Sequence, residues 1–281
     1  MRQSTLQDAV TFSGVGLHSG SKCSVTLRPA PAGTGIVFRR IDLEGSPHIP
    51  AVVENVARTD RCTTIEAGSA SVSTIEHLMA ALRGMEVDNA LVDVDGPEVP
   101  IADGSAAPFV RLIEQAGVAA LDAPRRVVAV DRPTWVRSGD KVAVALPHDG
   151  FRVSFTFTND HKHPALSDLF AEFDVSPEVF VEEIAPARTI GWLSEVETLR
   201  KNGLALGATM DMAVVIGHDR VLTPMRFHNE PVRHKVLDLI GDLYLAGFVR
   251  AHVICVRSNH AMNTSLARKI AWGKQEAELT E

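Results

Sequence analysis

Hydrophobic and polar residues follow a helical period between Arg226 and Leu243. Asn229 is placed to cap the start of this helix, and Pro231 suits its first turn, where no amide hydrogen bond is lost. One stripe is apolar and is expected to face the core: Val232, Val236, Leu239, Ile240 and Leu243. Polar residues recur at every fourth position within one quadrant: His234, Asp238 and Asp242, with Lys235 at its edge. The pattern predicts an amphipathic helix that carries a row of ionisable groups.

This row of ionisable groups has two interpretations. A His and an Asp one turn apart, such as His234 and Asp238, can bind the same metal ion. A polar quadrant can equally be the solvated face of the helix, on which the same two residues form a pair worth roughly a few tenths of a kcal/mol. Spacing alone favours the solvated face, so support for a metal has to come from the rest of the chain.

The N-terminal residues read as the beginning of a sheet. Residues 22–29 alternate between apolar and polar side chains, and residues 36–40 form a second strand-like run. We expect these two runs to pair as a hairpin. The preceding loop, GVGLHSG at residues 14–20, has neither the glycine spacing of a dinucleotide-binding motif nor the lysine of a P-loop. By pattern alone, His18 in this loop is a turn residue.

A second helix is indicated by a capping box. Ser73 followed by Glu76 predicts a helix that starts near Thr74 and ends at Gly84. In a capping box the carboxylate of Glu76 would only accept a hydrogen bond from a backbone amide. However, Glu76 directly precedes His77 in the first turn, a position from which a histidine can reach across a domain interface.

The two halves of the chain share a pattern. The run GDKVAVALPHDGFRVSFTF from Gly139 repeats the arrangement of GSKCSVTLRPAPAGTGIVF from Gly20, and in both halves a helix leads into a further strand. Such an echo predicts a duplicated domain. Periodicity lapses over residues 117–126, which marks a boundary. We therefore expect an N-terminal domain of residues 1–120 and a C-terminal domain of residues 127–281.

The second half carries an apolar-rich insertion at about residues 176–217. It includes a helical segment, SEVETLRKNG, and a strand-like segment, DMAVVIG. This extra layer either shapes a binding passage or packs as ordinary core.

Composition limits the classes of function. The net charge of -7 argues against nucleic-acid binding, which needs clustered Lys and Arg. The opening MRQSTLQDAV lacks the apolar run of a signal peptide, and no apolar stretch is long enough to span a bilayer, so we expect a cytoplasmic protein. The three cysteines are scattered and odd in number, which is typical of reduced thiols. A metal would then be bound by His, Asp or Glu.

A series of segments, in order along nearly the whole chain, resembles the motif set of the UDP-3-O-acyl-N-acetylglucosamine deacetylase family. They are GVGLHSG, RPAPAGTGIVFRR, STIEHLMAALRG, VDNALVDVDGPEVPIADGSAAPF, ARTIG, VRHKVLDLIGDL and SNHAMN. The resemblance implies a zinc hydrolase that releases acetate from UDP-3-O-acyl-GlcNAc in the committed step of lipid A synthesis. It also implies an α+β fold of two topologically similar domains, each a sheet layered against helices, with the active site at their interface.

The same resemblance assigns roles to individual residues. The zinc ligands it implies are His77, His234 and Asp238. The catalytic residues it implies are Glu76 as general base, His260 as acid, Asp242 as the partner that orients His260, and Thr189 as a donor to the oxyanion. The substrate contacts it implies are Lys235, His18, His161 and Arg257, and the acyl chain would lie against the insertion.

Three positions depart from the family pattern. Ile190 follows Thr189 where the family usually has Phe, and His161 stands where the family has an aromatic residue that stacks on uridine. Arg257 replaces a frequent Lys, which keeps the charge but changes its geometry. These differences affect contacts with the sugar and the uracil of the substrate and leave the metal chemistry intact.

The residue types suit this chemistry independently of the family. Two imidazoles and one carboxylate leave a fourth position open on zinc, as in hydrolytic sites, and zinc lowers the pKa of water toward neutrality. Glu76 beside His77 could take the proton of that water, and Asp242 would keep His260 protonated. Two other functions use the same residues or scaffold: a zinc amidohydrolase acting on another acylated amino sugar, and a non-catalytic module that binds nucleotide sugars or lipids. Transient contact with a membrane surface and the oligomeric state stay open.

Overall fold

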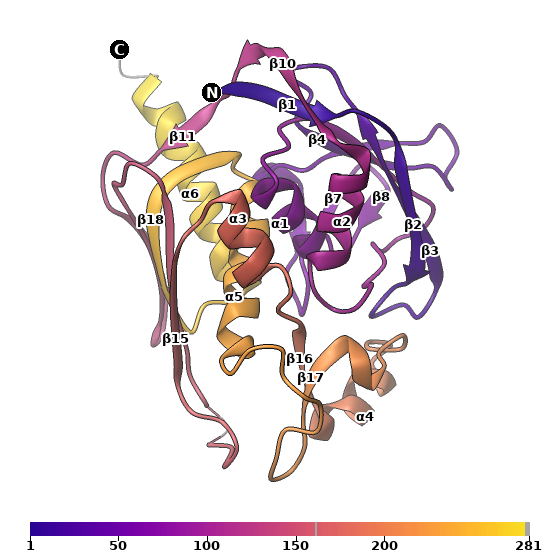
Figure 1. The fold of residues 1–281 in the computed structure, drawn as a ribbon, viewed down its shortest axis with the longest axis vertical. Helices are drawn as coiled ribbons and strands as arrows, with labels where there is room; N and C mark the ends of the chain where they lie inside the picture. The colour runs from indigo at the N-terminus through magenta and orange to yellow at the C-terminus, as the bar shows by residue number, and fades with distance from the viewer. Residues whose placement is uncertain (161, 279–281) are drawn as a thin grey trace.

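The computed structural model describes residues 1–160 and 162–278 and has two larger sheets on the outside with helices between them (Figure 1). The first sheet has the order β2 (Val10–Val15), β3 (Lys22–Pro29), β9 (Ala90–Val94), β4 (Ile36–Arg40) and β5 (His48–Pro50). The second has the order β12 (Thr134–Ser138), β13 (Lys141–Leu146), β18 (Phe248–Val256), β14 (Phe151–Phe157) and β15 (Leu169–Asp174), and β11 (Val127–Ala129) also pairs with β18.

Both sheets are built in the same way. In each sheet the strand that comes last in the chain, β9 or β18, lies in the middle, antiparallel to one neighbour and parallel to the other. Each central strand follows a helix, α1 (Glu76–Gly84) or α5 (Glu230–Tyr244). The predicted α+β class with two topologically similar units is therefore confirmed.

The remaining elements connect or cover these units. In the N-terminal half they are β1 (Arg2–Leu6), η1 (Val53–Asn55), β6 (Val56–Arg58), β7 (Thr64–Ala67), β8 (Ala70–Val72), α2 (Ala107–Ala116) and β10 (Val118–Pro124). In the C-terminal half they are α3 (Pro177–Val179), η2 (Phe180–Ile184), β16 (Thr189–Trp192), α4 (Leu193–Lys201), η3 (Met210–Met212), β17 (Ala213–Ile216) and α6 (His260–Glu278). None of the helices within the described residues is long and apolar enough to cross a membrane.

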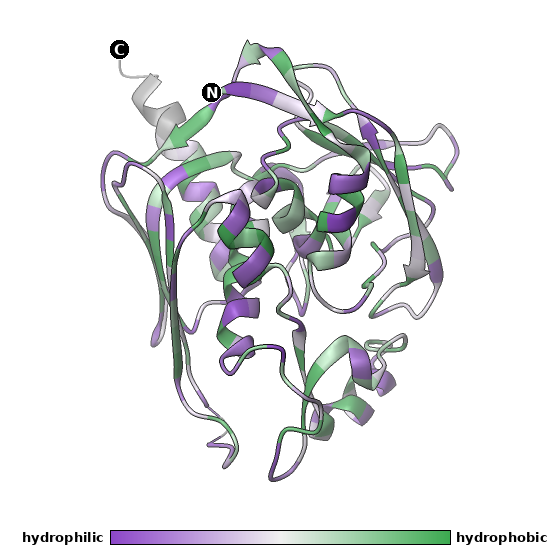
Figure 2. Cartoon of the chain, in the orientation of Figure 1, coloured by the Kyte–Doolittle hydropathy of each residue, from purple (hydrophilic) through white to green (hydrophobic). Residues whose placement is uncertain are grey.

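The predicted hairpin between residues 22–29 and 36–40 is wrong. Both runs are strands, but β9 lies between them and pairs with each. Alternation along a strand reveals which face is buried and does not identify the neighbouring strand. Strands of both sheets carry hydrophobic as well as hydrophilic residues, as Figure 2 shows.

The segment expected to be an irregular boundary also differs from the prediction. Residues 118–124 form strand β10, which pairs antiparallel with β1. Exposed and half-buried residues alternate along it, but several of its side chains are alanines, which weakens the hydrophobic signal. The division into domains of residues 1–120 and 127–281 stays a prediction.

Helix α1 begins later than the capping box predicts. Thr74 has φ of 58°, a left-handed conformation that cannot belong to the helix, and α1 starts at Glu76. The amide of Ser73 donates to the carbonyl of Pro97 (2.9 Å), whereas the Glu76 carboxylate accepts from the amide of Thr63 (3.0 Å). The capping-box interpretation of Glu76 is therefore wrong, because its carboxylate binds the amide of Thr63 instead of the amide of Ser73.

Helix α5 begins at Glu230, directly after the predicted cap Asn229, and ends at Tyr244, one residue beyond the helical pattern. Asn229 occupies the cap position, but its side chain accepts a hydrogen bond from Arg233 Nε (2.6 Å) and does not cap the helix. The predicted apolar stripe is buried throughout.

The insertion forms a small layer of its own, visible at the lower right of Figure 1. Strands β16 and β17 pair in parallel, and α4 packs on β16. Its loop reaches the N-terminal half, where the amides of Leu206 and Gly207 donate to the carbonyls of His18 (3.2 Å) and Leu17 (3.1 Å). The insertion therefore bridges the two halves.

Helices α1 and α5 lie side by side in the centre of the molecule (Figure 1) and make the most extensive contact between any two elements. A Cβ atom added to Gly241 of α5 would lie 2.0 Å from the carbonyl oxygen of Glu76. The two backbones can approach this closely because position 241 has no side chain. This contact sets the distance between groups on α1 and groups on α5.

We predict that Gly241→Ala separates α1 from α5 and lowers the free energy of unfolding by about 1–3 kcal/mol, the usual cost of overpacking a core. Urea denaturation followed by circular dichroism measures this change. The matched control is Gly273→Ala in α6, where an added Cβ would meet no described atom within 4 Å. Gly273→Ala should leave the free energy of unfolding unchanged or raise it. Equal stability of the Gly241→Ala variant and the natural protein would contradict the prediction.

Candidate metal centre and active site

Three potential metal ligands meet where α1 and α5 cross. The Oδ1 atom of Asp238 lies 3.3 Å from Nε2 of His234 and 3.6 Å from Nε2 of His77. One ligand atom from each residue lies within 4.8 Å of the others. Zinc bonds of about 2.0–2.2 Å in a tetrahedron place neighbouring ligand atoms about 3.3–3.6 Å apart. The spacing therefore fits a single ion between the three side chains.

The burial of these groups excludes the solvated-face interpretation. His77 is 4% exposed, and His234 and Asp238 are each 2% exposed. The Oδ1 atom of Asp238 is fully buried and accepts no hydrogen bond from any described residue. Leaving a charged oxygen buried without a partner is costly. A cation bound between the three side chains would supply the missing partner.

The imidazole of His234 is prepared to act as a ligand. The Nδ1 atom of His234 donates to the carbonyl of Ala187 (3.1 Å), which leaves the lone pair of Nε2 directed at Asp238. Burial lowers the pKa of His234 to about 3, and the nearby charge of Asp238 only partly opposes this effect. The imidazole is therefore neutral near pH 7, as metal binding requires.

Lys235 lies beside the ligand carboxylate. Its Nζ atom donates to Oδ2 of Asp238 at 2.8 Å. Burial alone would lower the pKa of Lys235, but the charge of Asp238 outweighs it and raises that pKa, so the amine stays protonated. The hydrogen bond orients the carboxylate so that Oδ1 faces the histidines. A contact between Lys235 and the substrate stays a prediction.

Glu76 stands next to the ligand His77 at the start of α1. Its side chain is 3% exposed and accepts a hydrogen bond from the amide of Thr63. Burial raises the pKa of Glu76, and the charges of His260 and His77 oppose the increase. A buried carboxylate with a raised pKa is a suitable proton acceptor near neutral pH.

His260 and Asp242 form a buried pair on α6 and α5. The Nδ1 atom of His260 donates to Oδ2 of Asp242 at 2.9 Å. Asp242 is fully buried and also accepts from Asn263 Nδ2 (2.9 Å) and from Thr63 Oγ1 (2.6 Å). Burial alone would lower the pKa of His260, but the charges of Asp242, Asp238 and Glu76 raise it to about 9. The imidazole is therefore a cation at neutral pH.

Two other predicted residues lie at the edge of this cluster. The amide of Thr189 donates to the carbonyl of Gly104 (2.9 Å), two residues beyond the carbonyl that binds His234. His18 is close enough to His260 for the charge of that imidazole to act on it, and both ring nitrogens of His18 are buried without a partner among the described residues. Burial is the main reason why the pKa of His18 is lowered.

Arg257, a further predicted contact, is already paired within the chain. The guanidinium of Arg257 forms ion pairs with Asp140 (2.6 Å) and Asp160 (2.8 Å). A role for Arg257 in substrate binding stays a prediction. His161 lies outside the described residues.

Three participants were not anticipated from the pattern. Ala187 contributes only a backbone carbonyl, and Thr63 lies in an irregular loop, so neither position carries a sequence signal. Asn263 falls within the SNHAMN segment, three residues after His260 and thus on the same face of α6. That helical spacing could have identified Asn263 as a second donor to Asp242.

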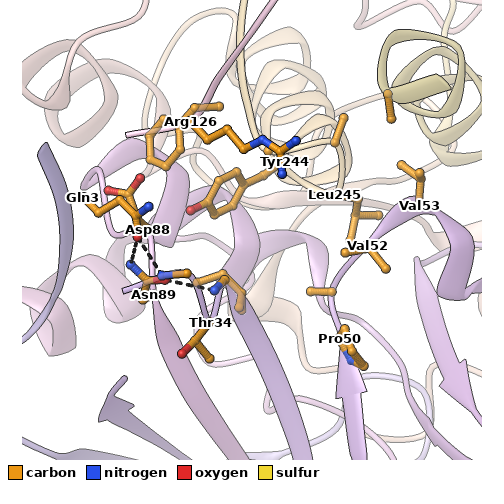
Figure 3. Close-up of a pocket in the computed structure, with 18 of the residues that line it drawn as sticks. Gln3, Thr34, Pro50, Val52, Val53, Asp88, Asn89, Arg126, Tyr244 and Leu245 are labelled. Carbon is orange, nitrogen blue, oxygen red and sulfur yellow. Dashed lines mark hydrogen bonds between the residues drawn. The ribbon is translucent and has the colours of Figure 1, made fainter. Parts of the chain in front are cut away.

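A cavity of about 400 Å³ elsewhere in the molecule does not compete with this site (Figure 3). Part of its polar lining is already paired within the chain: Asn89 Nδ2 donates to Gln3 Oε1 (2.9 Å), and Gly35 N donates to Asn89 Oδ1 (3.0 Å). The phenol of Tyr244, which also lines it, donates to the carbonyl of Val87. The cluster of ionisable groups between α1, α5 and α6 is the stronger candidate for chemistry.

Comparison with known proteins gives a consistent result. The family model described as UDP-3-O-acyl N-acetylglycosamine deacetylase matches residues 3–272. The UDP-3-O-acyl-N-acetylglucosamine deacetylase of Geobacter sp. (strain M21) is 49% identical over 271 residues, which cover 95% of this chain and 88% of the relative. The enzyme of the same name from Idiomarina loihiensis is 44% identical over 283 residues, or 97% and 92% of the two chains. That from Vibrio cholerae is 44% identical over 276 residues, or 96% and 90%.

We predict that the purified protein binds one divalent metal ion. His77→Ala and Asp238→Ala should each reduce the metal content by roughly an order of magnitude or more, because each removes a proposed ligand. Elemental analysis after desalting measures the metal. The control is Asp93→Ala, since Asp93 is equally buried but is paired with Arg28 (2.7 Å) and Arg39 (2.5 Å). Normal metal content in the two ligand variants would remove these residues from the coordination sphere.

Proposed function

Because the chain belongs to the UDP-3-O-acyl N-acetylglycosamine deacetylase family, we propose that it hydrolyses the acetyl amide of UDP-3-O-acyl-GlcNAc with zinc bound by His77, His234 and Asp238. This reaction releases acetate and is the committed step of lipid A biosynthesis. The observation that carries the proposal is the unpaired, buried Asp238 Oδ1 facing two imidazole nitrogens. Glu76 and His260 lie beside it as a proton acceptor and a cation.

The ligand set supports zinc in particular. Two histidines and one carboxylate are typical of hydrolytic zinc sites, which keep one position open. When bound, zinc supplies a Lewis acid that polarises a carbonyl oxygen and lowers the pKa of water. No cysteine takes part: all three cysteines are buried and form no disulfide, which supports a location in the reducing cytoplasm.

Glu76 acts as the general base in this proposal. Its carboxylate adjoins the ligand His77 and is held by the Thr63 amide, so it accepts a proton from the water that attacks the acetyl carbonyl. Because burial raises the pKa of Glu76, the carboxylate binds this proton more readily than an exposed glutamate would.

His260 acts as the acid. Asp242 fixes the ring through Nδ1, so Nε2 carries the proton that can reach the substrate. The imidazolium stabilises negative charge on the carbonyl oxygen and then protonates the departing amine. We propose the hydroxyl of Thr189 as a further donor to that oxygen; losing one such donor typically costs about 3 kcal/mol of barrier.

The remaining contacts serve the substrate. We propose that Lys235, His18, His161 and Arg257 contact the substrate, at the interface between two domains of residues 1–120 and 127–281. The insertion at residues 176–217 would bind the acyl chain. Its large apolar side chains are unusually exposed for their type: Leu193 at 40%, Leu206 at 50% and Met210 at 49%. The same surface would allow transient contact with a membrane from which the lipid substrate is taken.

The first test is turnover of UDP-3-O-acyl-GlcNAc by the purified zinc-loaded protein, with release of acetate detected by mass spectrometry. We predict that UDP-GlcNAc, which lacks the acyl chain, has a kcat/KM lower by about two orders of magnitude, because remote binding energy positions the reacting carbonyl. Chelation of zinc should abolish turnover of both. Equal kcat/KM values for the two substrates would defeat the role of the insertion.

The second test separates the base from the acid. Glu76→Gln should lower kcat/KM by on the order of 10²–10⁴ and keep zinc, because the residue is not a ligand. Since His260 must be protonated and its pKa is about 9, wild-type activity should fall as pH rises through about 9. His260→Ala should be slower by a similar factor and lack this alkaline decrease.

The control for this second test is His252→Ala, because His252 pairs with Ser154 (2.7 Å) on the second sheet. It should retain the wild-type rate and the wild-type pH profile. Near wild-type activity of Glu76→Gln at neutral pH would refute the assignment of the base.

A further inference from the structure

Thr63 connects the two acid–base groups of the site. It lies in the loop between β6 and β7 and is fully buried. Its amide donates to Oε2 of Glu76 at 3.0 Å, and its hydroxyl donates to Oδ1 of Asp242 at 2.6 Å. Within the described part of the chain, no other residue donates a hydrogen bond to both carboxylates.

These two hydrogen bonds join different parts of the molecule. Glu76 begins α1 in the N-terminal half, whereas Asp242 lies near the end of α5 in the C-terminal half. The Thr63 carbonyl also accepts from the amide of Ile75 (3.4 Å), just before α1. One residue therefore contacts the start of the helix that carries the base and the carboxylate that orients the acid.

The hydroxyl of Thr63 has a specific effect on Asp242. The other two donors, His260 Nδ1 and Asn263 Nδ2, both bind Oδ2, so Thr63 is the donor to Oδ1. With donors on both oxygens, the plane of the carboxylate is fixed, and so is the direction of its hydrogen bond to His260. Without the hydroxyl, Oδ1 is a buried acceptor with no donor, and the carboxylate can turn to share its remaining partners.

We propose that Thr63 is a positioning residue that keeps the Asp242–His260 pair in a fixed position relative to Glu76 during catalysis. The proposal rests on the proposed function, in which Glu76 takes a proton and His260 delivers one. Both groups must reach the same acetyl amide, and small displacements of a catalytic group produce large losses of rate. Thr63 itself does not touch the substrate and acts through the two carboxylates.

A purely structural role makes a different prediction. If Thr63 only anchors the loop before α1, loss of its hydroxyl lowers stability as it would at any buried threonine, and kcat is unaffected in the folded protein. If Thr63 positions the acid, kcat falls while KM and zinc content are retained, because neither the ligands nor the substrate contacts change. Restoring a hydroxyl without the methyl group should restore kcat.

The experiment compares Thr63→Val, Thr63→Ala and Thr63→Ser, each zinc-loaded and assayed well below its unfolding temperature. Val and Ala should lower kcat about 10- to 100-fold with KM within about twofold of the natural protein, and Ser should recover most of the loss. The matched control is Thr5→Val, because Thr5 is also buried and its hydroxyl bonds the carbonyl of Asn89 (2.8 Å) and the amide of Ala30 (2.8 Å). It should keep the natural kcat.

A crystal structure of Thr63→Val gives a readout that does not depend on turnover: the Asp242 carboxylate should be rotated and the His260 ring displaced. Natural kcat in Thr63→Val, an equal loss in Thr5→Val, or no recovery in Thr63→Ser would overturn the proposal. If Thr63→Val and Thr63→Ala both fail to fold while Thr63→Ser folds, the hydroxyl has a structural role, and this result would also overturn the proposal. Absence of turnover in the natural protein and in Thr5→Val would instead reject the proposed function.

Discussion

The close crossing of α1 and α5 is the constraint on which the site depends. Position 241 must be glycine because any Cβ atom there would overlap the Glu76 carbonyl, 2.0 Å away. The contact therefore falls at Glu76, the proposed base, and next to His77, a proposed metal ligand. A wider crossing would draw His77 away from Asp238 and leave a metal with ligands from α5 alone.

Three buried carboxylates lie within this small region, and their surroundings give them different properties. Burial alone would raise the pKa of Asp238, but the Lys235 ammonium that donates to its carboxylate and the surrounding imidazoles together hold that pKa well below the usual value. The Asp242 carboxylate accepts hydrogen bonds from three residues. Glu76 receives one hydrogen bond from the described residues, from a backbone amide, and burial raises its pKa. Opposite pKa shifts in neighbouring carboxylic acids are expected where one acid binds a cation and another accepts and releases protons.

Much of the fold and part of the site could be predicted from sequence, where the signal is local. The helical period of α5 placed His234, Asp238 and Asp242 on one side, and the repeated pattern revealed the two similar units. The period could not show that this polar side is buried, because burial depends on α1 and α6 packing over it. The capping-box interpretation of Glu76 failed because a left-handed Thr74 shifts the start of the helix. Thr63 was missed since a loop has no period.

The duplication explains why the site occurs where it does. Helices α1 and α5 are equivalent elements of the two units, each leading into the central strand of its sheet, and they pack against each other. In the proposed function each helix contributes part of the chemistry: α1 carries the proposed base and one proposed ligand, and α5 carries two proposed ligands and the partner of the proposed acid. Neither helix carries all three potential ligands, so a metal bound to them would add its binding free energy to the contact between α1 and α5. The contact between the two helices would then be both the active site and a contact that the metal strengthens.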